Sequence, residues 1–252
     1  MGKLTRKILK EAIDETLSDV LGANNPDYVS LNDAVANFNR WFQGSKVVDE
    51  NGDPLLCYHG TPTGGFTVFN TIAGVDKKTK WQLLFGSHFT NSQGQADIYR
   101  DMKKTKNRMV YTVFLSIKNP IDLTAHGEYA VVSKPIKETP YAWSNHPEVV
   151  DAIHGLIEPR ILKKFRLPDS NNECYNLWNI LNDLTPFKAR KIIEELGFDG
   201  IKYDARYIMG PNLPGYGNER RDVSWIAFYP NQIKSATGNN GMFSPDSEDI
   251  YK

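Results

Sequence analysis

The chain has 252 residues and a mass of 28.6 kDa, which is enough for one large domain with a real hydrophobic core. Its 30 Lys and Arg balance 30 Asp and Glu, so a general attraction to nucleic acid or anionic membranes has no support. Only Cys57 and Cys174 occur, which excludes a disulfide framework and a four-cysteine zinc site. There is no apolar run of membrane-spanning length and no signal-peptide pattern, so we expect a cytoplasmic protein.

Residues 1–44 are expected to form an N-terminal helical segment. Apolar residues recur at three- and four-residue spacing over 4–21, and a second helix begins at the cap Ser30 or Asn32 and runs to Phe42. The first helix either packs on the main domain or acts as an arm that binds a partner.

A main domain over 45–237 is predicted to alternate short strands with single helices. Strands are expected at 55–59, 85–90, 110–117, 198–203 and 223–229, with helices at 92–102 and 186–196. Residues 121–184 are interpreted as a helical insertion. The segment 238–252 is expected to be a flexible tail because it is rich in Gly, Asn, Ser and Asp. This pattern predicts an α+β fold with a split antiparallel sheet.

The sequence contains none of the short motifs that mark common metal-binding, hydrolase or nucleotide-binding sites. The five histidines show no metal-ligand spacing, and no GxSxG, P-loop or GxGxxG sequence occurs, so we expect no metal and no nucleotide site of those types. The histidines are His59, His88, His126, His146 and His154.

One group of residues does point to a ligand site. The sequence Tyr58-His59-Gly60-Thr61 ends a predicted strand, where the glycine permits close approach of a planar group to the main chain. The sequence FGSHFTNS follows, with His88 and Phe89, and Tyr99 lies on the helix after it.

Together with VVDENGDPLLCYHGT, VFLSIKNPID, GFDGI and FYPNQIKSATGNNGMFSP, these blocks resemble the ADP-ribosyltransferase-like domains of phage polyvalent proteins and bacterial polymorphic toxins. The blocks cover most of residues 40–250, with the middle insertion unmatched. The resemblance implies an ADP-ribosyltransferase fold in which split sheets enclose a cleft for NAD⁺.

In that cleft the resemblance implies that Gly60 pairs with the nicotinamide amide and His59 contacts a ribose hydroxyl. Tyr99 falls where the family stacks an aromatic ring on nicotinamide. Thr61, His88 and Phe89 complete the predicted NAD⁺-binding set. NAD⁺ serves as co-substrate, with no metal.

The sequence departs from the family at the residue expected to accept a hydrogen bond from the ribose 2′-hydroxyl. Related enzymes carry a glutamate there, and this chain carries Ser224. Asp222 and Glu219 are the nearby acids, and any of the three is a candidate for the role.

The function expected is a mono-ADP-ribosyltransferase acting on a macromolecular acceptor, protein or nucleic acid (RNA or DNA), as a phage effector or toxin, in the host cytoplasm or packaged in a phage particle. The Tyr- and Arg-containing loop 204–222 suits a nucleic-acid acceptor, and protein acceptors stay equally open. The N-terminal helix is a candidate site for an antitoxin or delivery partner. The alternatives are an inactive module that binds NAD, ADP-ribose or a partner, an NAD glycohydrolase, and a structural virion protein.

Overall fold

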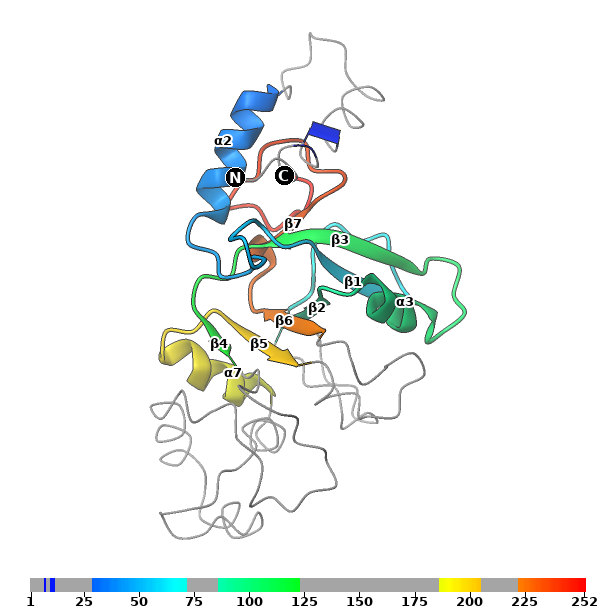
Figure 1. Ribbon diagram of the computed structural model, residues 1–252. Coiled ribbons are helices and arrows are strands. Elements are labelled where there is room, and N and C mark those ends of the chain that lie inside the picture. Colours follow the sequence, from blue (N-terminus) through cyan, green and yellow to red (C-terminus); the bar gives the residue numbers. More distant parts are fainter. Residues whose placement is uncertain (1–6, 8–9, 12–28, 72–85, 123–185, 205–221) are drawn as a thin grey trace.

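The computed structural model describes residues 7, 10, 11, 29–71, 86–122, 186–204 and 222–252. Seven strands form one curled sheet in the order β4-β5-β6-β2-β1-β3-β7 (Figure 1). The strands are β1 Cys57–Thr61, β2 Ser87–Thr90, β3 Met109–Leu115, β4 Pro120–Asp122, β5 Gly200–Asp204, β6 Val223–Ala227 and β7 Ile233–Ser235. The helices are α2 Leu31–Phe42, α3 Gln93–Asp101 and α7 Pro186–Glu195, and a short 3₁₀ turn spans Pro230–Gln232.

The sheet is nearly divided between β1 and β2. All neighbours pair antiparallel except β4 and β5, which are parallel. The pairs β1–β3 and β2–β6 run over five and four residues, whereas β1 and β2 share only the pair Tyr58–Thr90. The predicted α+β class is confirmed, and the predicted split takes the form of one mixed sheet that narrows to a single residue pair.

Side chains alternate between the two faces of this sheet, as strand geometry requires. One face carries Cys57, Phe89, Val113 and Trp225, which belong to the larger hydrophobic cluster; we call it the core face. The opposite face is covered by α2 and α3, and we call it the helix face.

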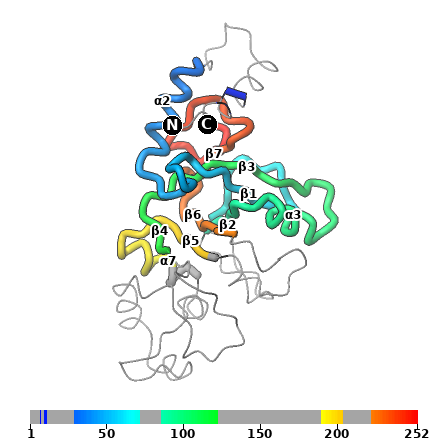
Figure 2. The backbone as a smooth tube through the Cα atoms, viewed as in Figure 1, coloured from blue at the N-terminus to red at the C-terminus, as the bar shows by residue number. Residues whose placement is uncertain are grey.

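Helix α2 begins at the predicted cap. The Ser30 hydroxyl accepts a hydrogen bond from the Asp33 backbone N–H at 3.2 Å, which satisfies one of the free donors of the first turn. The helix buries Ala34, Phe38, Trp41 and Phe42 at helical spacing. The Phe38 ring lies 5.0 Å from that of Phe114 in β3, so α2 is part of the body of the protein (Figure 2).

The C-terminal segment differs from its prediction. Residues 238–252 were expected to form a flexible tail, but Phe243 and Ile250 are almost fully buried. Lys234, which has no exposed surface, donates from Nζ to the carbonyls of Ser247 at 2.8 Å and Asp249 at 3.0 Å. The polar composition of the segment suggested mobility. It does not reveal that a buried lysine, Lys234, binds the main chain of the segment and holds it in place.

A hydrogen-bond network joins three of the sequence blocks. The Gln232 amide oxygen accepts from the backbone N–H groups of Phe228 and Tyr229, and its nitrogen donates to the Asp199 carbonyl at 2.9 Å. The Asp199 carboxylate accepts from the backbone N–H groups of Lys118 and Asn119. These motif residues therefore align β4, β5 and β6 rather than contact a ligand.

The predicted insertion begins later than residue 121. Residues 120–122 form β4, which pairs with β5, and the Lys202 ammonium lies 2.9 Å from the Asp122 carboxylate. Proline at position 120 suggested a stop, but an edge strand tolerates proline because its outer N–H needs no partner. The remaining insertion, 123–184, lies outside the described residues.

The described helices are all too short or too polar to cross a membrane.

Candidate active site

His59 lies on β1 directly after the last residue that pairs with β2. Its Nδ1 atom is 2.7 Å from the carbonyl oxygen of His88. A carbonyl only accepts, so Nδ1 carries the proton and donates it. Burial among the rings of Phe69, Phe89 and Tyr111 lowers the pKa of His59, and the backbone hydrogen bond opposes this shift more weakly. The neutral ring therefore presents Nε2 as a hydrogen-bond acceptor.

Gly60 is required by the packing of α3 on β1. A Cβ atom at this position would lie 1.6 Å from the carbonyl oxygen of Ala96 and 3.0 Å from the backbone nitrogen of Arg100. Gly60 therefore brings α3 against the strand. Tyr99 lies on the same turn of α3, between these two contact residues.

Tyr99 is half-buried, and burial raises the pKa of its phenol to about 12, so it stays neutral at physiological pH. Helix α3 starts where the sequence predicts, because the Ser92 hydroxyl accepts from the Gln95 backbone N–H. His59 and Gly60 thus lie on β1 beside the opening between β1 and β2, and α3, which carries Tyr99, packs against Gly60. The His59 ring lies on the core face of the sheet, and α3 lies on the helix face.

His88 and Ser224 form a second group, on the helix face of β2 and β6. Ser224 pairs with Thr90 of β2 and with Tyr203 of β5. The Tyr203 hydroxyl lies 2.9 Å from Nδ1 of His88. Sequence reasoning missed Tyr203. The pairing of β5 with β6 places Tyr203 beside Ser224, and the sequence alone does not reveal that pairing.

Ser224, the residue at the position where the resemblance predicted a carboxylate, is 1% exposed and offers a hydroxyl instead. Ser224, Thr90 and Tyr58 lie in one row across three strands, so Ser224 is roughly 10 Å from β1 at ordinary strand spacing. Asp222 precedes β6 and is half-buried beside Asn91, whose side-chain oxygen accepts from the Val223 N–H at 3.0 Å. Glu219 lies outside the described residues, as does the 205–221 part of the predicted acceptor loop.

Phe89 does not fit its predicted role as a ligand-contacting side chain. It is 2% exposed and points into the core face, 5.2 Å from the ring of Phe69. His88 and Phe89 necessarily point to opposite faces, and burial shows that Phe89 takes the face that meets the core. Thr61 ends β1, and its hydroxyl accepts from the Thr63 backbone N–H at 3.1 Å, closing the turn after the strand.

The loop after β1 is held over His59 by Tyr111. The Tyr111 hydroxyl accepts from the backbone N–H groups of Gly65 and Phe66 and donates to the Phe66 carbonyl. Three hydrogen bonds to one hydroxyl fix residues 65 and 66, so the loop and the His59 ring share one aromatic support.

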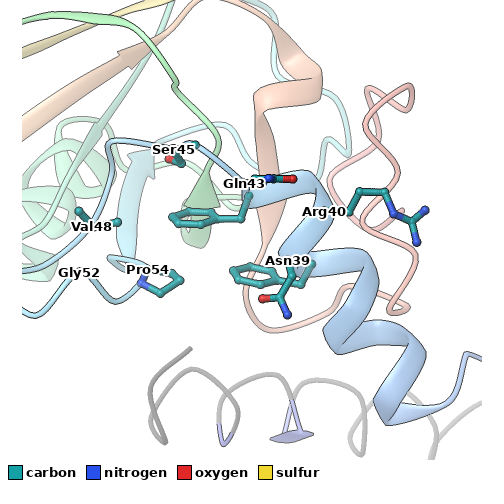
Figure 3. Close-up of a pocket in the computed structure, with 10 residues that line it drawn as sticks. Asn39, Arg40, Gln43, Ser45, Val48, Gly52 and Pro54 are labelled. Carbon is teal, nitrogen blue, oxygen red and sulfur yellow. The ribbon is translucent and has the colours of Figure 1, made fainter.

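A hollow of about 500 Å³ lies elsewhere, at the C-terminal end of α2 (Figure 3). It is lined by Phe38, Asn39, Arg40, Phe42, Gln43, Gly44, Ser45, Val48, Gly52 and Pro54. None of the predicted site residues lines it. Within the described ranges, no three His, Cys, Asp or Glu side chains are grouped as a metal site would need.

The family model for ADP-ribosyltransferases in polyvalent proteins matches residues 49–243, which is most of the chain and contains every described site residue. The chain belongs to this family. No curated protein matches it, and no solved structure matches it. The family's co-substrate is NAD⁺. The resemblance predicted from the sequence blocks is therefore confirmed at the level of the family and of the fold.

Proposed function

We propose that this protein is a mono-ADP-ribosyltransferase that cleaves NAD⁺ and transfers ADP-ribose to a macromolecular acceptor, as a phage effector or toxin. The observation that carries the proposal is the opening between β1 and β2 within the matched region, where β1 carries His59 and Gly60 and the helix that carries Tyr99 packs against Gly60. Their chemistry suits the nicotinamide half of NAD⁺.

Each residue has a role in this proposal that its surroundings support. The Nε2 atom of neutral His59 accepts a hydrogen bond from a ribose hydroxyl. The neutral ring of Tyr99 packs on the cationic pyridinium by area burial and cation–π attraction. Gly60 offers its backbone N–H and C=O to the carboxamide.

In the reaction, the bond between ribose C1′ and the nicotinamide nitrogen breaks, and its electron pair leaves with nicotinamide. The acceptor atom bonds to C1′ and loses its proton to solvent. The transition state resembles an oxocarbenium ion, so positioning and charge stabilisation matter more than a strong base. Ser224 and Asp222 are the described candidates to stabilise the positive ribose.

A catalytically inactive NAD-binding module is the second candidate, and the buried serine at position 224 favours it. A hydroxyl stabilises a developing cation less than a carboxylate does. Chain extension into a polymer is not part of the proposal.

The experiment uses NAD⁺ labelled on its adenosine half, purified protein, and bacterial lysate with or without RNase treatment. His59→Ala is the test variant. Met102→Ala is the matched control, because Met102 follows α3 and is 64% exposed.

We expect label on protein or RNA with the wild type and Met102→Ala, and at least ~10-fold less with His59→Ala, corresponding to about 1.4 kcal/mol for one lost hydrogen bond to the ribose. Nicotinamide release without label on a macromolecule would show that the protein is an NAD glycohydrolase and not a transferase. Intact NAD⁺ in lysates from several hosts would favour the inactive module.

A further inference from the structure

The backbone of Gly60 points into the opening between β1 and β2. In register, Tyr58 of β1 lies opposite Thr112 of β3. The Thr112 carbonyl accepts from Ala236 beyond β7, so Thr112 faces away from β1. Residues of an antiparallel strand alternate between its two edges. Tyr58 therefore faces β2, and so does Gly60 two residues later.

The backbone of His88 faces Gly60 from the other side. Asn91 donates its backbone N–H to the carbonyl of Val223, beside β6. By the same alternation, Thr90 and His88 direct their backbone groups toward β1.

The next pair of a continued ladder would be Gly60 with His88. The described pairing instead ends at Tyr58–Thr90. The His88 carbonyl, which the Gly60 N–H would take in that pair, accepts from the His59 side chain at 2.7 Å. The His59 side chain thus binds the same carbonyl that the backbone N–H of Gly60 would use in a continued ladder.

We propose that His59 is a spacer that keeps the sheet open: by binding the His88 carbonyl, it reserves the peptide groups of Gly60 for a planar carboxamide ligand. The assignment of that ligand as nicotinamide rests on the proposed function. The spacer role is separate from any contact of Nε2 with ribose, because it uses the other ring nitrogen.

The surroundings hold the spacer in place. The His59 ring meets Phe69 edge-on at 5.1 Å and lies 5.5 Å from Phe89. On the far side of β2, the Tyr203 hydroxyl holds the His88 ring at 2.9 Å. His88 is therefore held at two points: its carbonyl binds His59, and its imidazole binds the Tyr203 hydroxyl.

The test compares His59→Ala with His59→Asn in the full chain. Asparagine places an amide N–H near the position of Nδ1, so it can keep the bond to His88 while losing the ring. Thermal unfolding first checks that both variants fold.

The first readout needs no ligand. Hydrogen exchange of the Gly60 amide is followed by NMR. We expect Gly60 to exchange at the same rate in the wild type and His59→Asn, and at least ~10-fold more slowly in His59→Ala, because the ladder then closes. Equal exchange in all three proteins would overturn the spacer role.

The second readout is the binding of nicotinamide, which has the carboxamide but no ribose. His59→Asn should bind it within ~3-fold of the wild type, and His59→Ala at least ~10-fold more weakly, a difference of about 1.4 kcal/mol. Equal binding by both variants would overturn the inference, since the histidine would then act on ribose alone. A wild type that binds neither nicotinamide nor NAD⁺ would overturn the proposed function, and the exchange experiment would still decide the spacer role.

Discussion

Replacing Gly60 by alanine should separate α3 from β1. The new Cβ would lie 1.6 Å from the Ala96 oxygen and 2.5 Å from its carbonyl carbon, whereas ordinary contact begins at 3.4 Å. The atoms it meets are helix backbone, which cannot rotate away as a flexible side chain can. The helix must therefore move by about 1.8 Å to restore ordinary contact, or the strand must bend.

Overpacking of a well-packed region costs about 1–3 kcal/mol, and a clash with backbone places Gly60→Ala at about 3 kcal/mol. For a chain of this size each kcal/mol shifts Tm by about 2–4 °C, so we expect a loss of about 6–12 °C in thermal unfolding. NAD⁺ binding should fall as well, because Tyr99 moves with the helix.

Gly94→Ala is the matched control, because Gly94 belongs to α3, the helix that packs on Gly60, but is exposed. Its Cβ would approach no atom closer than Ser92 Oγ at 4.0 Å. Alanine in a helix should stabilise the protein by about 0.5–1 kcal/mol. A Gly60→Ala protein that unfolds within 1 °C or so of the wild type would refute the reasoning from α3 packing.

Three further changes follow from single side chains. Lys234→Met leaves the carbonyls of Ser247 and Asp249 without their donor, so urea unfolding should show a loss of about 2–4 kcal/mol. Burial lowers the pKa of Lys234 to about 8, so the unfolded chain holds a proton that the folded one releases. The wild type's unfolding free energy should accordingly gain from this group as pH rises from 8 to 10.5, and the Lys234→Met protein should lack that gain. Burial lowers the pKa of His59 in the folded protein below the ordinary value of 6.5, so the unfolding free energy should fall as pH drops through 6.5 toward the folded pKa, and His59→Asn should flatten this slope. Tyr111→Phe removes the acceptor of two backbone N–H groups and should cost about 2 kcal/mol in the same assay; no change would mean that water replaces the hydroxyl.

Local signals predicted much of the fold. Ser30, one of the two predicted caps, begins α2, and α3 and α7 lie within the predicted helical ranges 92–102 and 186–196. Gly197 follows α7 with a positive φ of 86°, as is common at the ends of helices. Capping and turn residues act on their own neighbours in sequence, so a single chain suffices to recognise them.

Contacts between residues far apart in the chain could not be predicted from the sequence. The burial of residues 238–252 depends on Lys234, whose charge suggests exposure and whose actual partners are main-chain carbonyls. The exclusion of Phe89 from the site depends on which face of β2 meets the core, and strand alternation alone leaves that choice open.

In the candidate site, too, local features could be predicted from the sequence and long-range contacts could not. Gly60 was singled out as a place of close approach, but the atom that approaches it is the Ala96 oxygen of α3. Tyr203 was missed because its partner His88 is 115 residues away in the chain. Pairing of β5 with β6, and of β6 with β2, creates that contact.

Release of nicotinamide from NAD⁺ would show whether the opening beside Gly60 is an NAD⁺ cleft. Chromatography would quantify nicotinamide formed by the wild type, by Met102→Ala and by Tyr99→Ala in the presence of lysate. We predict release by the first two and at least ~10-fold less by Tyr99→Ala, since the loss of ring packing on the pyridinium is worth about 1.4 kcal/mol or more. Equal release by Tyr99→Ala and the wild type, or unchanged NAD⁺ with all three proteins, would contradict the account.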